Sequence, residues 1–253
     1  MSGVEQVASA DGTPIAYRAI GSGEPLLMVH GSGTASGDWT FALPFLRERF
    51  TVVTMDRRGR GRSGDAPDYA MEREAEDILA VRDAVDAELL VAHSYGALCA
   101  MLAAERTNRL RRLVLYEPPI AVKKDRVPGV EQLIAAGDLD AAVEGFLRAA
   151  GAPPAQLEAI RSSPAWPLLR DAMPALPREL RAASAWRPPR EPLDVPTLLL
   201  LGADTTGSVY VDGLDEVEAA FTNVRRELIP GQQHIAHVFA AEAFAQLVAD
   251  FCG

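Results

Sequence analysis

Cysteine and long apolar runs are both scarce in this sequence. Its 253 residues include only two cysteines, Cys99 and Cys252, which are too few for a disulfide scaffold. No stretch approaches the roughly 18 apolar residues of a membrane span. The first residues, "MSGVEQVASADG", lack the basic start and the apolar core of a signal peptide. From these absences we expect a cytoplasmic protein with no membrane partner.

A basic surface is missing as well. The formal net charge at pH 7 is −10, whereas proteins that bind nucleic acids place positive charge against the phosphates. The charge therefore argues against a nucleic-acid partner, and its simplest role is to keep the chain in solution. The length fits one α/β domain with an insertion.

Short apolar runs that are typical of buried strands alternate along the chain with segments of helical periodicity. The first two strands form a hairpin, because "EQVASADGTPIAYRAI" carries the turn signal Asp11-Gly12. The runs typical of parallel strands are "PLLMVHG", "TVVTMD", "ELLVAHS" and "RLVLYE". Apolar positions three and four apart predict a helix over 70–87. This alternation predicts an α/β fold, with a mostly parallel central sheet and helices on both faces.

The alternation stops between residues 118 and 196. This segment is rich in proline and contains helical pieces such as "GVEQLIAAGDLDAAVEGFLRAAG". Strand and helix patterns resume at "PTLLLLG". We therefore predict a core built from residues 1–117 and 197–253, and a helical lid, residues 118–196, inserted between two late strands.

Ser94 stands where a buried strand meets a helix of small residues. Its surroundings, Ala92-His93-Ser94-Tyr95-Gly96, match the G-x-S-x-G turn except that alanine replaces the first glycine. In that turn the serine lies on a strained bend, and its small neighbours let strand and helix approach closely. The turn also directs the N–H of Tyr95 toward the point where a negative oxygen would form. We predict that Ser94 is a nucleophile; the alternative is a serine that caps the helix.

With this turn, the chain resembles the α/β-hydrolase family over nearly its whole length. Three further segments carry the resemblance: "HGSG" at 30–33, "DRRGRGRS" at 56–63 and "PGQQH" at 230–234. The resemblance implies an α/β-hydrolase fold, and it assigns the backbone N–H of Ser32 as a second donor to the oxyanion. The glycines of the second segment, with Gly64, also match G-x-G-x-x-G. No helix opens directly after them, so we expect no dinucleotide cofactor.

His234 is the predicted base. The family runs serine, acid, histidine along the chain, which leaves His234 and His237 as candidates. His234 lies in the segment that resembles P-G-x-G-H, with Gln233 in place of the usual glycine. His237, one helical turn on, is the alternative. Asp and His do not occur at the spacing of metal ligands, so we expect no metal.

Two carboxylates compete for the role of the acid. In the commonest family pattern it lies three residues past the glycine that ends a late strand, but "LLLLGADTT" has Thr205 there and Asp204 one residue early. In an extended segment, a shift by one residue turns a side chain to the opposite face. Glu117 ends the strand after the serine strand, where haloalkane dehalogenases and zearalenone-type lactone hydrolases carry their acid. We predict Glu117, with Asp204 as the alternative.

These residues predict a serine hydrolase that forms an acyl-enzyme on Ser94. Trp186, near the end of the lid, and Trp39 are the candidates for substrate contact. The apolar lid suggests a fairly hydrophobic ester or lactone as the small-molecule partner. Alternatives with the same triad are a carbon–carbon hydrolase or a cofactor-free perhydrolase, and a third is a ligand-binding protein with little turnover. The sequence does not give the oligomeric state, and a homodimer is left open.

Overall fold

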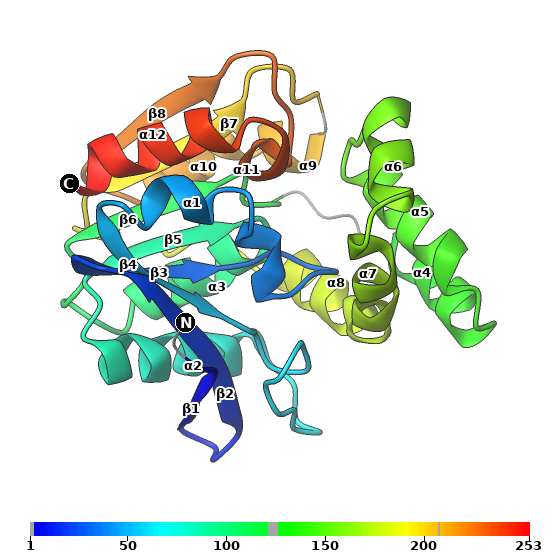
Figure 1. The fold of residues 1–253 in the computed structure, drawn as a ribbon, viewed down its shortest axis with the longest axis horizontal. Coiled ribbons are helices and arrows are strands. Elements are labelled where there is room, and N and C mark those ends of the chain that lie inside the picture. Colours follow the sequence, from blue (N-terminus) through cyan, green and yellow to red (C-terminus); the bar gives the residue numbers. More distant parts are fainter. Residues whose placement is uncertain (1–2, 121–125, 207) are drawn as a thin grey trace.

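An eight-stranded sheet forms the centre of the computed structural model, which describes residues 3–120, 126–206 and 208–253 (Figure 1). The strand order is β1-β2-β4-β3-β5-β6-β7-β8. The first two strands form the predicted hairpin, the second is antiparallel to β4, and all other pairs are parallel. The strands are β1 (Glu5–Ala8), β2 (Pro14–Gly21), β3 (Glu24–Val29), β4 (Phe50–Met55), β5 (Leu89–His93), β6 (Arg112–Tyr116), β7 (Thr197–Gly202) and β8 (Val224–Ile229).

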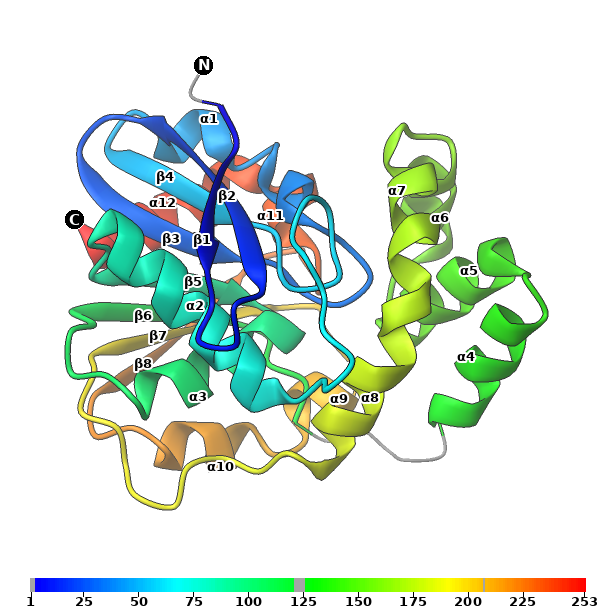
Figure 2. The same cartoon turned by 90° about the horizontal axis from the view of Figure 1, so that it is seen from below.

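Helices cover both faces of this sheet, as the alternation predicts. On one face lie α2 (Met71–Val85), α3 (Tyr95–Ala104) and α10 (Leu214–Ala219). In Figure 2, α10 lies below the strands and α12, on the opposite face, lies nearer the top of the view. On the other face lie α1 (Leu43–Leu46), α11 (Ala236–Phe239) and α12 (Ala241–Cys252), with the short 3-10 helix η1 (Ser36–Trp39) beside them. A further short helix, α9 (Ser208–Val211), follows β7.

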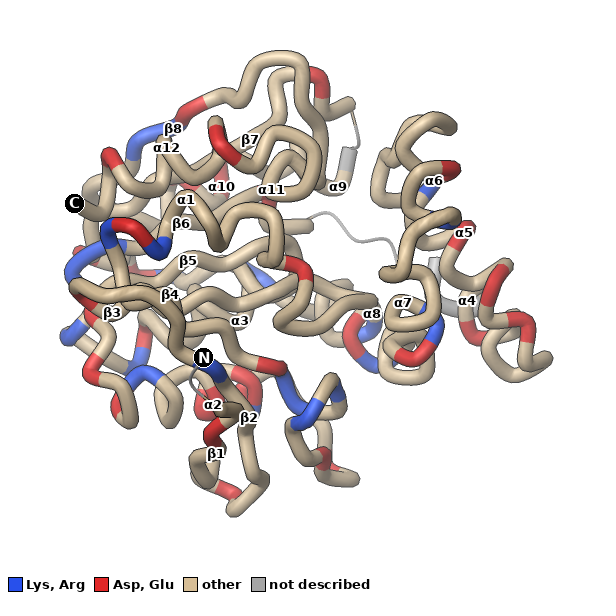
Figure 3. The backbone as a smooth tube through the Cα atoms, viewed as in Figure 1, with Lys and Arg blue, Asp and Glu red and all other residues tan. Residues whose placement is uncertain are grey.

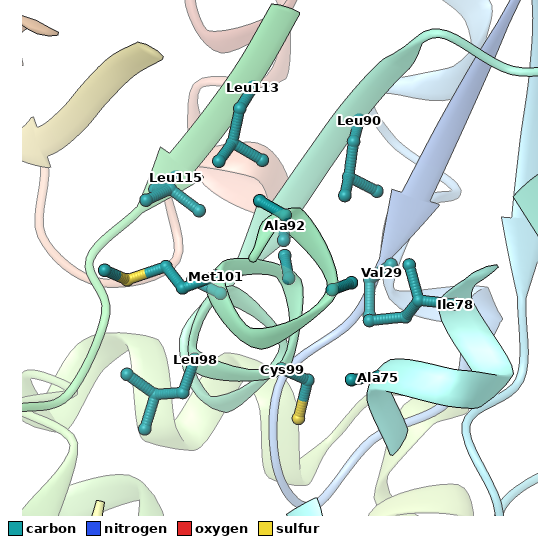
Figure 4. Packing of buried hydrophobic residues seen from close by; sticks show 14 of the residues in the cluster. Val29, Ala75, Ile78, Leu90, Ala92, Leu98, Cys99, Met101, Leu113 and Leu115 are labelled. Carbon is teal, nitrogen blue, oxygen red and sulfur yellow. The ribbon is translucent and has the colours of Figure 1, made fainter. Parts of the chain in front are cut away.

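The pleat of the strands divides the buried residues between two cores. In β3, Leu26 and Met28 belong to the core under α12, whereas Leu27 and Val29 belong to the core under α2 and α3. Figure 4 shows the second core, where Cys99 of α3 packs among apolar side chains. Burial raises the pKa of the Cys99 thiol well above its ordinary value, which keeps the thiol protonated and unreactive.

The segment between β6 and β7 forms a separate group of helices at one end of the sheet (Figures 1 and 2). These helices have a small apolar core of their own, which includes Val143, Trp166, Met173 and Leu176. They are α4 (Arg126–Ala135), α5 (Leu139–Ala149), α6 (Pro154–Arg161), α7 (Ala165–Ala172), η2 (Met173–Ala175) and α8 (Leu176–Ala185). The group falls inside the predicted lid, and we call α4 to α8 the helical insertion.

Charged residues of both signs are interspersed along the backbone rather than gathered into one basic face (Figure 3). Within residues 3–120, 126–206 and 208–253, none of the helices combines the length and the apolar character needed to cross a membrane.

Candidate active site

Ser94 lies on the sharp turn between β5 and α3. Its backbone has φ 53° and ψ −126°, a conformation that costs about 1–3 kcal/mol and persists only where the surroundings enforce it. Gly96 makes the turn possible, because a Cβ at this position would lie 2.4 Å from the carbonyl oxygen of His30. A Cβ on Gly31 would lie 2.9 Å from the Cβ of Ser94. Gly96 and Gly31 are therefore required by close packing around the turn, which leaves the serine hydroxyl at the carboxyl edge of the sheet.

The turn brings Ser94 into a chain of hydrogen bonds with His234 and Glu117. The Nε2 atom of His234 lies 3.1 Å from the hydroxyl oxygen of Ser94, and its Nδ1 atom lies 2.8 Å from Oε2 of Glu117. All three residues are buried. These distances place a nucleophile, a base and an orienting carboxylate within hydrogen-bond reach of each other.

The second oxygen of Glu117 is held from β7. Its Oε1 accepts a hydrogen bond from the N–H of Gly202 at 2.7 Å and one from the hydroxyl of Thr205 at 2.5 Å. Thr205 occupies the position where the family pattern has its acid, and here it supports the carboxylate that comes from β6. Asp204 has an exposed side chain, and its N–H donates to the carbonyl of Gln232. The structure thus brings Glu117, and not Asp204, to His234.

The loop that carries His234 is fixed on both sides. The hydroxyl of Tyr116 donates to the carbonyl of Gln233 and accepts from the N–H of Ala236. The Nε2–H of His93 donates to the carbonyl of His234 itself at 2.9 Å. Sequence analysis missed both supports, because residues that bond across more than a hundred positions leave no local pattern.

The two expected oxyanion donors have free backbone N–H groups. Among the described residues, neither the N–H of Ser32 nor that of Tyr95 donates a hydrogen bond. The carbonyl of Gly31, on the same peptide as the N–H of Ser32, accepts from Arg57 and from Nδ1 of His30, both at 2.9 Å. A trans peptide directs its C=O and its N–H to opposite sides. The hydrogen bonds from Arg57 and His30 to the carbonyl of Gly31 therefore orient the N–H of Ser32 away from Arg57.

Arg57 belongs to a buried ionic group that joins the helical insertion to the sheet. Its guanidinium pairs with both oxygens of Glu74 on α2, at 2.8 and 2.7 Å, and with Glu179 on α8 at 2.6 Å. Arg60 also pairs with Glu179, at 2.8 Å. Burial alone would lower the pKa of Arg57, but the charges of Glu179 and Glu74 outweigh it and raise that pKa well above its ordinary value.

The hydroxyl of Ser94 faces a pocket between the sheet edge and the helical insertion. Its apolar wall includes Phe146, Leu147, Leu169 and Ile235. Residues from α5 and α7 therefore roof the site, while the loops after β3, β5 and β8 form its floor.

Neither tryptophan expected to contact substrate lines this pocket. Trp39 is fully buried in the core under α12, where its ring packs on Phe244 and His237. Trp186 follows α8 and is buried in the core under α2 and α3. This corrects the expectation for both residues, because burial against the body removes each ring from the site. The side chain of Tyr95 also points away, with its ring 4.7 Å from the Arg57 guanidinium.

Three described residues could hold a metal ion. Ligand atoms of Asp38, His93 and His237 all lie within 4.8 Å of one another. His237 Nε2 lies 3.0 Å from Asp38 Oδ2, and Nδ1 of His93 lies 3.8 Å from the same oxygen. His237, the alternative base, thus contacts Asp38 and makes no such contact with Ser94.

Comparison with known proteins identifies the family of this chain. A sequence model described as "Alpha/beta hydrolase family" matches residues 26–247. The chain belongs to the alpha/beta hydrolase family. A solved structure of an alpha/beta hydrolase from Sphaerobacter thermophilus is 31% identical and superposes with a TM-score of 0.85, covering 98% of this chain and 100% of that one. The fold predicted from the sequence is thereby confirmed.

Curated relatives of this alpha/beta hydrolase are similar over shorter stretches. A non-heme haloperoxidase from Rhodococcus erythropolis is 35% identical over 134 residues, which are 48% of this chain and 47% of that protein. A 2-hydroxymuconate semialdehyde hydrolase from a Pseudomonas species is 37% identical over 103 residues, 38% of this chain and 36% of that protein. This chain spans about half the length, or less, of the curated relatives it matches.

Proposed function

We propose that this alpha/beta hydrolase is a serine hydrolase that cleaves a carboxylic ester or lactone of a fairly hydrophobic small molecule. The observation that carries the proposal is the chain of hydrogen bonds from Glu117 through His234 to Ser94, at 2.8 and 3.1 Å, beside an apolar pocket. The helical insertion acts in this proposal as the predicted lid over the site.

In the first half of the reaction His234 removes the proton from the Ser94 hydroxyl while the serine oxygen bonds to the acyl carbon. Glu117 orients His234 and stabilises the imidazolium that forms. The N–H groups of Ser32 and Tyr95 stabilise the negative oxygen of the tetrahedral intermediate. His234 then gives its proton to the departing alkoxide, and the acyl group stays on Ser94.

In the second half His234 removes a proton from a water molecule, which attacks the acyl-enzyme. Collapse of the second tetrahedral intermediate releases the carboxylic acid and returns the proton to Ser94. This cycle uses only side chains and backbone amides of the chain together with water, so the proposal needs no cofactor.

Labelling with a fluorophosphonate probe tests this proposal. Wild type and Ser94→Ala are treated with the probe, and ester and lactone hydrolysis is measured in the same samples. We expect wild type to be labelled and active and the variant to lose both properties. An unlabelled and inactive wild type would instead support the ligand-binding alternative.

Two other activities that the same triad can support are tested beside ester hydrolysis. The resemblance to a haloperoxidase favours a perhydrolase, and the resemblance to a semialdehyde hydrolase favours cleavage of a carbon–carbon bond. Halide oxidation with peroxide and a carboxylic acid tests the first, and hydrolysis of β-diketones tests the second. If Ser94-dependent turnover of either exceeded that of every ester and lactone, the ester assignment would be replaced.

A further inference from the structure

Asp38 places one carboxylate in the wall of the pocket that Ser94 and His234 line. It lies on η1, after the segment that carries Ser32, and its side chain is 18% exposed. Its Oδ2 accepts the hydrogen bond from Nε2 of His237 at 3.0 Å. Its other oxygen, Oδ1, accepts no hydrogen bond from any residue in the described part of the chain. Asp38 therefore has one anchored oxygen and one available oxygen.

The carboxylate of Asp38 stays ionised in this position. Burial alone would raise its pKa, but attraction to His237 and the hydrogen bond from it have the larger combined effect and lower that pKa. An ionised carboxylate accepts hydrogen bonds and donates none. Its interaction with a bound molecule is therefore attractive for a donor or a cation and repulsive for an anion.

The hydrogen-bond partner of this carboxylate, His237, does not itself line the pocket. The other polar residues there are uncharged serine, threonine and glutamine side chains and two histidines, and no described lysine or arginine lines the pocket. One of these histidines, His93, is held neutral, because burial and the neighbouring histidines lower its pKa well below its ordinary value. Since its Nε2–H donates to the carbonyl of His234, Nδ1 bears a lone pair, 3.8 Å from Asp38 Oδ2. The lone pair adds to the negative potential.

We propose that Asp38 sets the substrate class of this site. Its carboxylate accepts a hydrogen bond from a hydroxyl or ammonium group of the substrate, and it excludes esters that also carry an ionised carboxylate. The inference rests on the proposed ester hydrolysis. The preferred substrate is then an apolar ester or lactone with one hydrogen-bond donor near the scissile group. At a separation of roughly 6 Å and an effective dielectric constant of about 20, repulsion between two carboxylates weakens binding by about a hundredfold.

Three ethyl esters of similar size measure this selectivity: ethyl butanoate, ethyl 3-hydroxybutanoate and monoethyl succinate. For wild type we expect kcat/KM for the succinate to lie about a hundredfold below that for the butanoate. In Asp38→Asn the amide oxygen still accepts a hydrogen bond from His237, but the negative charge is removed. We expect the ratio of kcat/KM for the butanoate to that for the succinate to fall at least tenfold. The preference for the hydroxy ester over the butanoate should fall severalfold, because the amide NH₂ group then takes the place of Oδ1 and cannot accept a hydrogen bond from the substrate hydroxyl, so that a charge-assisted hydrogen bond is lost.

The ratio between esters is the readout, because Asp38→Asn also changes the field at His234 and so alters the turnover of all three. Asp68→Asn is the matched control: Asp68 is exposed and does not line the pocket, and the change removes the same charge. We expect it to leave both ratios unchanged. Equal succinate-to-butanoate ratios in wild type and Asp38→Asn would overturn the inference, provided that both proteins melt at similar temperatures.

Binding separates this inference from the proposed function. The three esters are titrated into Ser94→Ala and into Ser94→Ala with Asp38→Asn, with ligand-detected NMR as the readout. Discrimination against the succinate in the first protein and its loss in the second would support the role of Asp38 even if wild type hydrolysed no ester. Equal binding of succinate and butanoate to Ser94→Ala would overturn the role of Asp38, whatever the turnover.

Discussion

Two largely buried clusters of polar residues lie on opposite sides of the Gly31–Ser32 peptide, and they differ in their access to the pocket: members of the histidine cluster line it, and members of the arginine cluster do not. The arginine cluster consists of Arg57, Arg58, Arg60, Glu74, Asp77 and Glu179. The histidine cluster consists of Asp38, His93, Ser94, Glu117, His234 and His237. Side chains of the first cluster are at most 1% exposed.

In the arginine cluster, the positive and negative side chains pair with one another. Arg57 meets Glu74 through two hydrogen bonds, and Arg58 meets Asp77 in the same way, at 2.7 Å for both contacts. Paired guanidinium and carboxylate groups of this kind satisfy most of each other's hydrogen-bonding capacity. The result is a fixed junction between α2, the loop after β4 and the helical insertion.

The histidine cluster opens onto the pocket through Asp38, His93, Ser94 and His234. Buried Nδ1 atoms of His93 and His237 have no hydrogen-bond partner in the described residues, and the Ser94 hydroxyl faces the pocket. The arginine cluster also contains two buried atoms without a hydrogen-bond partner among the described residues, Nε of Arg60 and Oε2 of Glu179. What distinguishes the histidine cluster is that four of its members line the pocket, whereas no member of the arginine cluster does. The comparison thus separates buried charges that hold the fold from buried groups that are available for chemistry.

Glu117→Gln is the change with the largest expected effect on turnover. The amide retains an oxygen for the N–H of Gly202, but its NH₂ group cannot accept the proton on Nδ1 of His234. That histidine then loses the tautomer and the stabilised cation that the reaction requires, and we expect kcat for an ester to fall about 10³–10⁴-fold. The measurement is kcat at saturating ester, together with the melting temperature.

Thr205→Val is the matched control for this change. It removes one hydrogen bond to Glu117 and leaves the carboxylate in place. We expect a loss in kcat of about tenfold or less, in line with roughly 1 kcal/mol for one hydrogen bond. If Glu117→Gln retained more than a tenth of wild-type kcat, Glu117 would not be the orienting acid.

Arg57→Met tests the other cluster and is expected to act on stability. It leaves Glu74 and Glu179 buried without their principal partner, and breaking a buried pair in this way costs about 3–5 kcal/mol. The measurement is the free energy of unfolding in urea. Turnover per folded molecule should fall less than in Glu117→Gln.

An exposed arginine provides the comparison for this loss. Arg109 pairs with Asp83 and Asp86 at the surface, where its side chain is 51% exposed. Arg109→Met should change the free energy of unfolding by only about 0–1 kcal/mol. Equal losses for Arg57→Met and Arg109→Met would break the distinction between a buried structural cluster and ordinary surface pairs.

The features that could be predicted from the sequence are those that a local pattern of residues determines. Alternating apolar runs predicted the sheet, since burial on both faces demands them. The turn at Ser94 could be predicted because its small residues follow a short local motif, although the contact that requires Gly96 is with the carbonyl of His30 at the end of β3. The sequence also indicated Glu117 as the partner of His234, because it ends the strand beside the serine strand.

Contacts between distant segments could not be predicted in the same way. Trp186 stands near the end of the predicted lid, yet its ring is buried against the body, and no periodicity distinguishes that packing from a substrate contact. Glu179 reaches Arg57 across 122 positions, and His237 reaches Asp38 across 199. Such pairs arise only when the completed sheet brings its loops to one edge.

Asp204→Asn is expected to have the smallest effect. Asp204 stands one residue before the position of the usual family acid, and its exposed side chain makes no contact with His234 among the described residues. We expect kcat/KM for any ester to remain within about twofold of wild type, as is usual for an exposed substitution outside the site. The measurement is steady-state kinetics of Asp204→Asn and Glu117→Gln side by side.

A large loss of activity for Asp204→Asn with near-normal activity for Glu117→Gln would mean that the loop after β7 rearranges during turnover and supplies the acid from Asp204. The hydrogen bond from Thr205 to Glu117 argues against this outcome, because the rearrangement would leave a buried carboxylate without one of its donors.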